Sequence, residues 1–172
     1  MPAAFAFPSR TLDDGAALRV AAPGDEAGIL AAIHALAAYE REPDAVRTTT
    51  TDLTSSLFGD DPKAFAHVIE RGGEIRAIAV WFLTFSTWTG RHGIWLEDLF
   101  VDEADRGRGY GTALLASLAS VALERGYPRL EWTVLDWNAP AVGFYRSIRA
   151  EAMDEWTTQR MTGEALTALA AR

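Results

Sequence analysis

The chain has 172 residues, of which 49% are apolar and 23% charged, and its formal net charge is −8. This length suits one domain with its own core, and the acidic balance argues against nucleic acid or an anionic membrane as the main partner, because both need clustered Lys and Arg. With no cysteine, disulfides, thiolate metal sites and cysteine nucleophiles are excluded.

Residues 1–15 contain two prolines, an Asp-Asp pair and a glycine without periodicity, which predicts a flexible N-terminal extension. Residues 16–172 are expected to form one α/β domain. Strands are expected at 17–21, 64–70, 74–85, 94–101, 129–135 and near 155–161, and helices at 23–42, 49–58, 109–126, 138–148 and from 163. No apolar run reaches the roughly 18 residues of a membrane helix, and the N-terminus lacks the basic start of a signal peptide. A cytoplasmic protein is therefore expected.

The stretch "RGRGYG" at 106–111 stands between an apolar strand and a helix. Glycines let the backbone approach a ligand closely, and the N–H groups at a helix start point toward an anion. The two arginines add positive charge. Thr112 occupies the place of the last glycine of a dinucleotide fingerprint, and no Gly-Lys-Ser/Thr follows as in a nucleotide P-loop. Taken alone, the turn is equally consistent with a plain glycine-rich loop.

A second motif, "WNAPAVGFYRS" at 137–147, follows about one helix and one strand later. The two motifs in this order resemble the acyl-CoA site of the GNAT N-acetyltransferase superfamily. The resemblance is closest to the spermidine/spermine (diamine) acetyltransferase branch, from about residue 17 onward, and is densest in "AAYE", "WTGRHGIWLEDLFV", "RGRGYGTALL" and "DWNAPAVGFY". It implies an α/β (α+β) fold with a central mixed, mostly antiparallel, splayed sheet flanked by helices, and acetyl-CoA as co-substrate.

The same resemblance implies the cofactor contacts. The pantetheine arm would pair with the backbone of Leu99, Phe100 and Val101. The pyrophosphate would lie on the glycine turn, formed by Arg106, Gly107, Arg108, Gly109, Tyr110, Gly111 and Thr112. Residues of the second motif would complete the cofactor site, namely Asn138, Pro140, Ala141 and Tyr145. The chain departs from the family at Ser147, which lacks a basic side chain, and at Arg149, where a helix-ending glycine is usual and a left-handed residue would be strained.

Tyr145 matches the family's tyrosine general acid, which would protonate the departing thiolate; core packing is the alternative for a helical tyrosine beside a phenylalanine. Glu97 and Asp98 are adjacent on a strand, so their side chains are expected on opposite faces and not as an acid–base pair. The resemblance selects Glu97 as the binder of the substrate ammonium or, through water, as the base. Asp98 is expected to be a structural hydrogen-bonding residue.

Further residues of the resemblance would line an acidic amine pocket suited to a polycation, and a solvated surface is the alternative for each. These candidates are Tyr39, Glu40, Trp88, Glu97, Glu131, Trp132, Thr133 and Asp154. The histidines lack metal-ligand spacing, and no metal is assigned.

The sequence therefore predicts an acetyl-CoA-dependent N-acetyltransferase acting directly on a primary amine of a small cationic substrate, such as a polyamine, a diamine or a lysine-like molecule. The alternatives are acetylation of another amine (an amino acid, an antibiotic or a protein N-terminus) and a non-catalytic acyl-CoA sensor. The glycine spacing disfavours a nucleotide-binding module. The resemblance also implies a homodimer.

Overall fold

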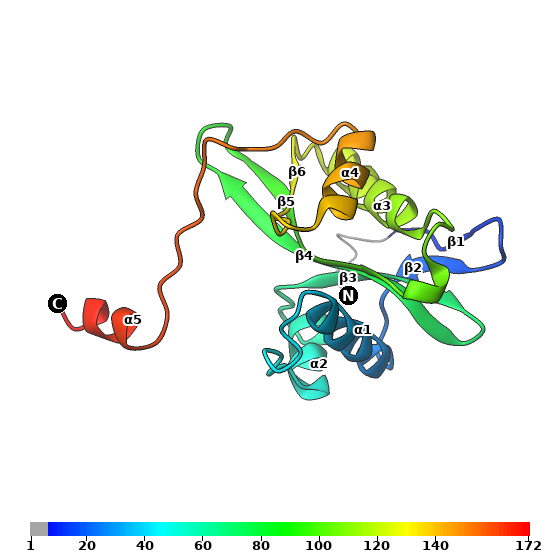
Figure 1. Cartoon of the computed structure of the whole chain (residues 1–172), viewed down its shortest axis with the longest axis horizontal. Helices are drawn as coiled ribbons and strands as arrows, with labels where there is room; N and C mark the ends of the chain where they lie inside the picture. The colour runs from blue at the N-terminus through cyan, green and yellow to red at the C-terminus, as the bar shows by residue number, and fades with distance from the viewer. Residues whose placement is uncertain (1–6) are drawn as a thin grey trace. The chain divides into compact units, whose positions relative to one another are not determined.

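The computed structural model describes residues 7–172 and divides the chain into two compact units, one ending at Thr133 and the other beginning at Val134. The first unit contains one six-stranded sheet in the order β1-β2-β3-β4-β5-β6 (Figure 1). Its strands are β1 (Arg10–Thr11), β2 (Ala17–Val20), β3 (Phe65–Arg71), β4 (Glu74–Ser86), β5 (Arg91–Val101) and β6 (Leu130–Glu131).

All neighbouring strands are antiparallel except β5 and β6, which are parallel. The predicted mixed, mostly antiparallel sheet is therefore confirmed. The parallel pairing is short, because it joins only Ile94 to Leu130 and Trp95 to Glu131. β5 continues to Val101 paired with β4 alone. The strand predicted at 129–135 is correspondingly reduced to β6, and the C-terminal half of β5 keeps one backbone edge outside the ladder.

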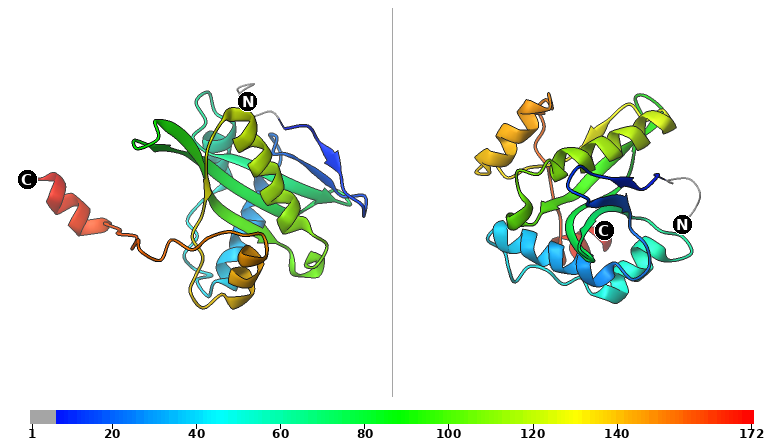
Figure 2. Two further views of the ribbon diagram at one scale, coloured as in Figure 1. Left: turned by 90° about the horizontal axis from the view of Figure 1, so that it is seen from above. Right: turned by 90° about the vertical axis from the view of Figure 1, so that its right-hand side faces the viewer.

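Helices cover both faces of this sheet, as two further views show (Figure 2). α1 (Glu26–Tyr39) and α2 (Thr50–Phe58) pack on one face, and α3 (Tyr110–Arg125) packs on the other. The core cluster on the first face joins Ile29 of α1 and Leu57 of α2 to Val68, Ile78 and Val80 of the sheet. On the other face, His67 of β3 is buried, and its Nδ1 atom lies 2.7 Å from Ser117 Oγ of α3. Helices cover both faces of β3 and β4, so consecutive side chains of these strands are buried. This burial explains why their sequences are almost continuously hydrophobic.

The N-terminal extension is more ordered than the sequence predicts, although residues 1–6 lie outside the described part. β1 pairs with β2 through Arg10 opposite Leu18 and Thr11 opposite Ala17. Gly15 adopts a left-handed φ of 82° in the connecting turn, a conformation that glycine adopts at little cost. The prediction of a flexible segment is therefore wrong from Arg10 onward, because cross-strand pairing supplies the order that a non-periodic sequence does not reveal.

The second unit contains α4 (Ala139–Ser147) and α5 (Gly163–Ala170). The strand expected near 155–161 is absent: this segment is irregular, and every residue from 151 to 172 is exposed. This segment has no neighbouring strand in the unit to pair with, and an isolated strand is not stable.

α1 and α4 end in the same way, with an arginine in the left-handed region. Arg41 has φ 68° and Arg149 has φ 64°. In α4 the Ala150 N–H donates to Tyr145 O (3.0 Å) and the Arg149 N–H to Arg146 O (3.0 Å), which is a Schellman motif. Arg149 thus takes the left-handed position in which glycine is usual, and the helix end keeps the geometry that glycine would give it.

Candidate active site

The glycine turn lies between the end of β5 and the start of α3. Gly107 (φ 80°) and Gly109 (φ 81°) are both left-handed, and a Cβ built on either would meet no atom within 4 Å. The turn therefore faces open space and leads into the N-terminus of a 16-residue helix, where unpaired backbone N–H groups favour an anion. The turn is therefore suited to bind an anion such as a pyrophosphate.

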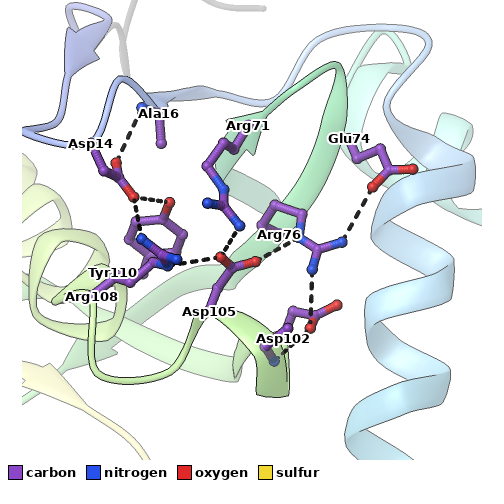
Figure 3. Close-up of polar contacts among 10 residues, drawn as sticks. Asp14, Ala16, Arg71, Glu74, Arg76, Asp102, Asp105, Arg108 and Tyr110 are labelled. Atoms are coloured by element: carbon purple, nitrogen blue, oxygen red, sulfur yellow. Dashed lines mark hydrogen bonds and ion pairs between the residues drawn. The ribbon is translucent and has the colours of Figure 1, made fainter.

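A buried carboxylate holds this turn in place from beneath. Asp105, which is 0% exposed, accepts from Arg76 Nε at 2.6 Å, is paired with Arg108 Nε at 3.1 Å, and also accepts from Arg71 (Figure 3). The guanidinium groups outweigh burial and hold the pKa of Asp105 below its usual range. Arg76 also pairs with Asp102 at 3.2 Å. We call Asp102, Asp105, Arg71, Arg76 and Arg108 the closed network.

The N-terminal hairpin adds a second anchor to the turn. Tyr110, the first residue of α3, donates its hydroxyl to Asp14 at 2.7 Å, and Arg108 lies 3.6 Å from the same carboxylate (Figure 3). The Tyr110 hydrogen bond is the main reason that the pKa of Asp14 is lowered. Burial and this carboxylate together raise the pKa of Tyr110 to about 12. Tyr110 is 1% exposed, so its side chain supports the turn from the core.

A β-bulge places Glu97 and Asp98 on the same face of the sheet. The register passes from Val80 opposite Asp98 to Trp81 opposite Leu96, so Glu97 is the extra residue of β5. Asp98 shares the face of Val80, which packs under α1 and α2. Trp95 is paired with Phe82 and therefore lies on the same face. Its indole N–H donates to Glu97 Oε2 at 3.0 Å, which places the Glu97 carboxylate on this face as well.

The expectation that Glu97 and Asp98 lie on opposite faces is therefore wrong. A bulge interrupts the alternation of an ideal strand and re-aims the residues that it contains. The signal cannot be read from the sequence, because the extra residue is defined only by the partner strand.

Three carboxylates gather on this face of the first unit: Glu40 at the end of α1, exposed Glu97 and half-buried Asp98. Burial, then Glu97, then Glu40 raise the pKa of Asp98 to about 6. Burial also raises the pKa of Glu40. No lysine or arginine pairs with these three groups in the described part of the chain. We call Glu40, Glu97 and Asp98 the open cluster.

Asp98 therefore does not play the structural hydrogen-bonding role expected of it. Its carboxylate is uncompensated, half-buried and shifted toward neutral pH, which is the condition of a group that binds a cation or exchanges a proton.

Tyr39 connects the open cluster to the glycine turn. The Arg106 guanidinium carbon lies 5.0 Å from the centre of the Tyr39 ring, and Arg106 Nε lies 3.5 Å from the Val101 carbonyl. A guanidinium over an aromatic face is stabilised by the ring quadrupole. The last residue of α1 thus contacts the first residue of the turn, and Glu40 follows directly.

The other predicted pocket residues of the first unit lie on the β4–β5 turn and on or just after β6, where Glu131 pairs with Trp95. Trp88 is 89% exposed at the β4–β5 turn, about 20 Å along the hairpin from Asp98 if each residue advances about 3.3 Å. Glu131 of β6 forms an ion pair with Arg129 at 2.8 Å, so its charge is balanced. Trp132 is half-buried and Thr133 exposed just after β6.

The second unit presents the residues of the second motif on α4. The Asn138 side chain accepts from the Ala141 N–H at 3.3 Å and so caps the helix, and Pro140 lies in the first turn. Tyr145 is half-buried, with its ring 5.4 Å from that of Phe144. Asp154 is exposed beyond the helix.

β5 pairs in parallel with β6 over only two positions and leads into a glycine turn at the start of α3. This arrangement offers a strand edge and an anion-binding turn, which suit a phosphate-bearing acyl carrier. Residues 30–149 match the model of the acetyltransferase (GNAT) family. The chain belongs to the GNAT acetyltransferase family, whose members use acetyl-CoA as co-substrate.

Named relatives agree with this assignment. The chain is 34% identical to a thialysine N-epsilon-acetyltransferase of Sus scrofa, covering 90% of this chain and 97% of the relative. It is 31% identical to a spermidine/spermine N(1)-acetyltransferase-like protein of Homo sapiens, covering 76% of this chain and 20% of that protein. A solved integron cassette protein of V. cholerae shares the fold, with a TM-score of 0.77 and 24% identity over 91% of this chain and 98% of that one. The predicted N-acetyltransferase is confirmed at the level of family and reaction class.

No helix of the described residues is both long and apolar enough to cross a membrane.

Proposed function

We propose that this chain transfers the acetyl group of acetyl-CoA directly to a primary amine of a small cationic substrate of the lysine-like or polyamine type. The open cluster is the observation that carries the proposal. Three carboxylates without a basic partner form a negative surface, and an alkylammonium group is the complementary ligand. Two of the relatives are named for amines of this kind, thialysine and spermidine/spermine.

The proton chemistry follows from the raised pKa of Asp98. An alkylammonium must lose a proton before its nitrogen can attack, and a base with a pKa near the working pH removes it best. Asp98, with a pKa of about 6, takes this proton through a water molecule, while Glu97 and Glu40 bind the cation. Trp95 fixes the Glu97 carboxylate through the indole N–H.

The acetyl carrier supplies a thioester whose carbonyl carbon forms the new C–N bond as the C–S bond breaks. The departing sulfur then needs a proton, and the Tyr145 hydroxyl donates it. The backbone edge of Leu99, Phe100 and Val101 outside the ladder holds the pantetheine arm. Gly107, Gly109 and the N-terminus of α3 hold the pyrophosphate.

One experiment tests the activity. The protein is incubated with acetyl-CoA and a panel of amines containing thialysine, ornithine, spermidine, putrescine, alanine and an aminoglycoside, and CoA release is followed. We expect turnover with the extended cationic amines and little with alanine. Binding of acetyl-CoA without turnover on any amine would favour the sensor alternative. Failure to bind CoA would contradict both.

Replacing Tyr145 by Phe tests the assigned acid. Removing the hydroxyl leaves the thiolate without its proton donor, so kcat should fall by about 10²–10⁴ while the Kd of CoA stays constant. Tyr127→Phe, which removes a hydroxyl from the first unit, is the control. An unchanged kcat in Tyr145→Phe would remove this residue from the mechanism.

We also propose that the protein is a homodimer. The wholly exposed segment after α4 carries large apolar side chains, and exposed apolar groups of this kind mark interaction surfaces; they are Met153, Trp156, Met161, Leu166 and Leu169. Sedimentation velocity should show a dimer, and Trp156→Glu should shift it toward the monomer. A monomeric wild type at micromolar concentration would contradict the proposal.

A further inference from the structure

The two arginines of the glycine turn have different surroundings. Arg108 is paired with Asp105 at 3.1 Å and with Asp14 at 3.6 Å. Its charge is balanced by two carboxylates, and its side chain is held against the protein. An anion that needs this guanidinium would have to compete with both partners.

Arg106 has no carboxylate partner among the described residues. Its contacts are the Tyr39 ring, 5.0 Å from the guanidinium carbon to the ring centre, and the Val101 carbonyl, 3.5 Å from Nε. The Tyr39 ring and the Val101 carbonyl use only part of the hydrogen-bonding capacity of a guanidinium, which has five N–H donors. Arg106 therefore keeps a net positive charge and retains N–H donors for an anion bound beside Gly107.

Tyr39 is well placed to fix this side chain. It is the last residue of α1, and α1 is anchored in the core by Ile29 and Ala32. The helix end is closed by the Glu42 N–H donating to Ala37 O at 2.9 Å, with Arg41 left-handed between them. A long arginine side chain loses much rotamer freedom when it binds an anion. A rigid ring that already holds it in place reduces this loss.

We propose that Tyr39 is a positioning residue for Arg106, which it orients to donate to the pyrophosphate of acetyl-CoA, and that it acts on the cofactor and not by contacting the amine. The proposal rests on the proposed function for the identity of the ligand. It also explains the difference between the two arginines: Arg108 maintains the shape of the turn, and Arg106 supplies its usable charge.

The test measures CoA binding by isothermal titration calorimetry, so it does not depend on finding the amine. Tyr39→Leu removes the ring face, and Tyr39→Phe keeps it. We expect the Kd of CoA to rise about three- to tenfold in Tyr39→Leu and to stay near the wild-type value in Tyr39→Phe. In an Arg106→Gln background, Tyr39→Leu should cause no further rise. An unchanged Kd in Tyr39→Leu, or an equal rise with and without Arg106, would overturn the proposal.

A second donor separates positioning from amine contact. Acetyl-pantetheine has the thioester and the arm but no pyrophosphate. With the amine found active, Tyr39→Leu should raise the KM for acetyl-CoA but leave the KM for acetyl-pantetheine and for the amine unchanged. A rise in the amine KM with both donors would instead make Tyr39 a substrate contact. If wild-type protein binds CoA but acetylates no amine, the proposed function fails while the calorimetric result still decides the role of Tyr39.

Discussion

The open cluster and the closed network contain the same kind of side chain in opposite electrostatic surroundings. Asp105 is fully buried, and arginines hold its pKa below the usual range. Asp98 is half-buried, faces Glu97 and Glu40, and has its pKa raised to about 6. Burial raises the pKa of both groups, and the sign of the neighbouring charges decides the outcome.

The difference shows which acidic group contributes to stability and which to function. A carboxylate surrounded by arginines has its charge neutralised and its oxygens hydrogen-bonded in the folded protein, so it does not attract a cationic ligand. A carboxylate surrounded by carboxylates costs free energy when ionised, and an incoming ammonium relieves that cost. Asp102 of the closed network follows Asp98 by only four positions, directly after the end of β5, so position along the sequence does not distinguish the two roles.

The largest expected effect is on catalysis. Asp98→Asn removes the group assigned as base, so kcat/KM for the amine should fall about 100-fold or more. In the wild type, log(kcat/KM) should bend near pH 6, below which Asp98 is protonated, and this bend should be absent in Asp98→Asn. Glu97→Gln is the matched control, which should weaken amine binding but retain the bend. A bend that persists in Asp98→Asn and disappears in Glu97→Gln would assign the base to Glu97.

The second effect is on the stability of the closed network. Asp105→Asn leaves three arginines around a neutral side chain, and breaking a buried ion pair from one side costs about 3 kcal/mol. Urea unfolding at pH 7 should show this loss, and it should shrink as the pH is lowered through the folded-state pKa of Asp105, where the wild type also loses the charge. Asp102→Asn, which removes a partner of Arg76 alone, should cost much less. Equal losses in the two variants would contradict a central role for Asp105.

The third effect has the opposite sign. The folded-state pKa of Asp98, about 6, exceeds the ordinary value of an aspartate, 3.8. The folded protein therefore binds an extra proton between these values, and wild-type stability falls as the pH rises from about 4 to 6. Asp98→Asn should therefore be more stable than the wild type at pH 7, by about 3 kcal/mol, and similar to it at pH 4. A variant less stable than the wild type at pH 7 would show that Asp98 is electrostatically satisfied.

The smallest effect concerns the coupling within the open cluster. Glu40 is the last of the three causes that raise the pKa of Asp98. Glu40→Gln should move the bend of log(kcat/KM) slightly to lower pH and raise the amine KM about two- to fivefold, as loss of one exposed charge pair would. Glu42→Gln, two residues further along, should change neither. A bend shifted to higher pH in Glu40→Gln would contradict the proximity of Glu40 and Asp98.

Elements with their own local signal were predicted well. Helices were expected at 49–58 and 138–148, and α2 and α4 lie there, with a capping box of Thr49 and Asp52 and a cap by Asn138. Strands were expected at 64–70 and 74–85, and β3 and β4 lie there. Elements that depend on a partner were not. β1 was missed because its order comes from pairing with β2, and the strand near 155–161 was expected from a pattern that has no partner in its unit.

The family and the glycine turn can be predicted from the sequence, because the backbone freedom of a turn and the cap of a helix depend on residues that are close along the chain. The acidic residue types are likewise given by the sequence. Tertiary structure alone decided what each charge does. The bulge opposite Val80 brought Glu97 and Asp98 to one face, the arginines of β3 and β4 neutralised Asp105, and the end of α1 placed Tyr39 under Arg106. Electrostatic energy depends on distance in space and on exclusion of water, and neither is written in the order of residues along the chain.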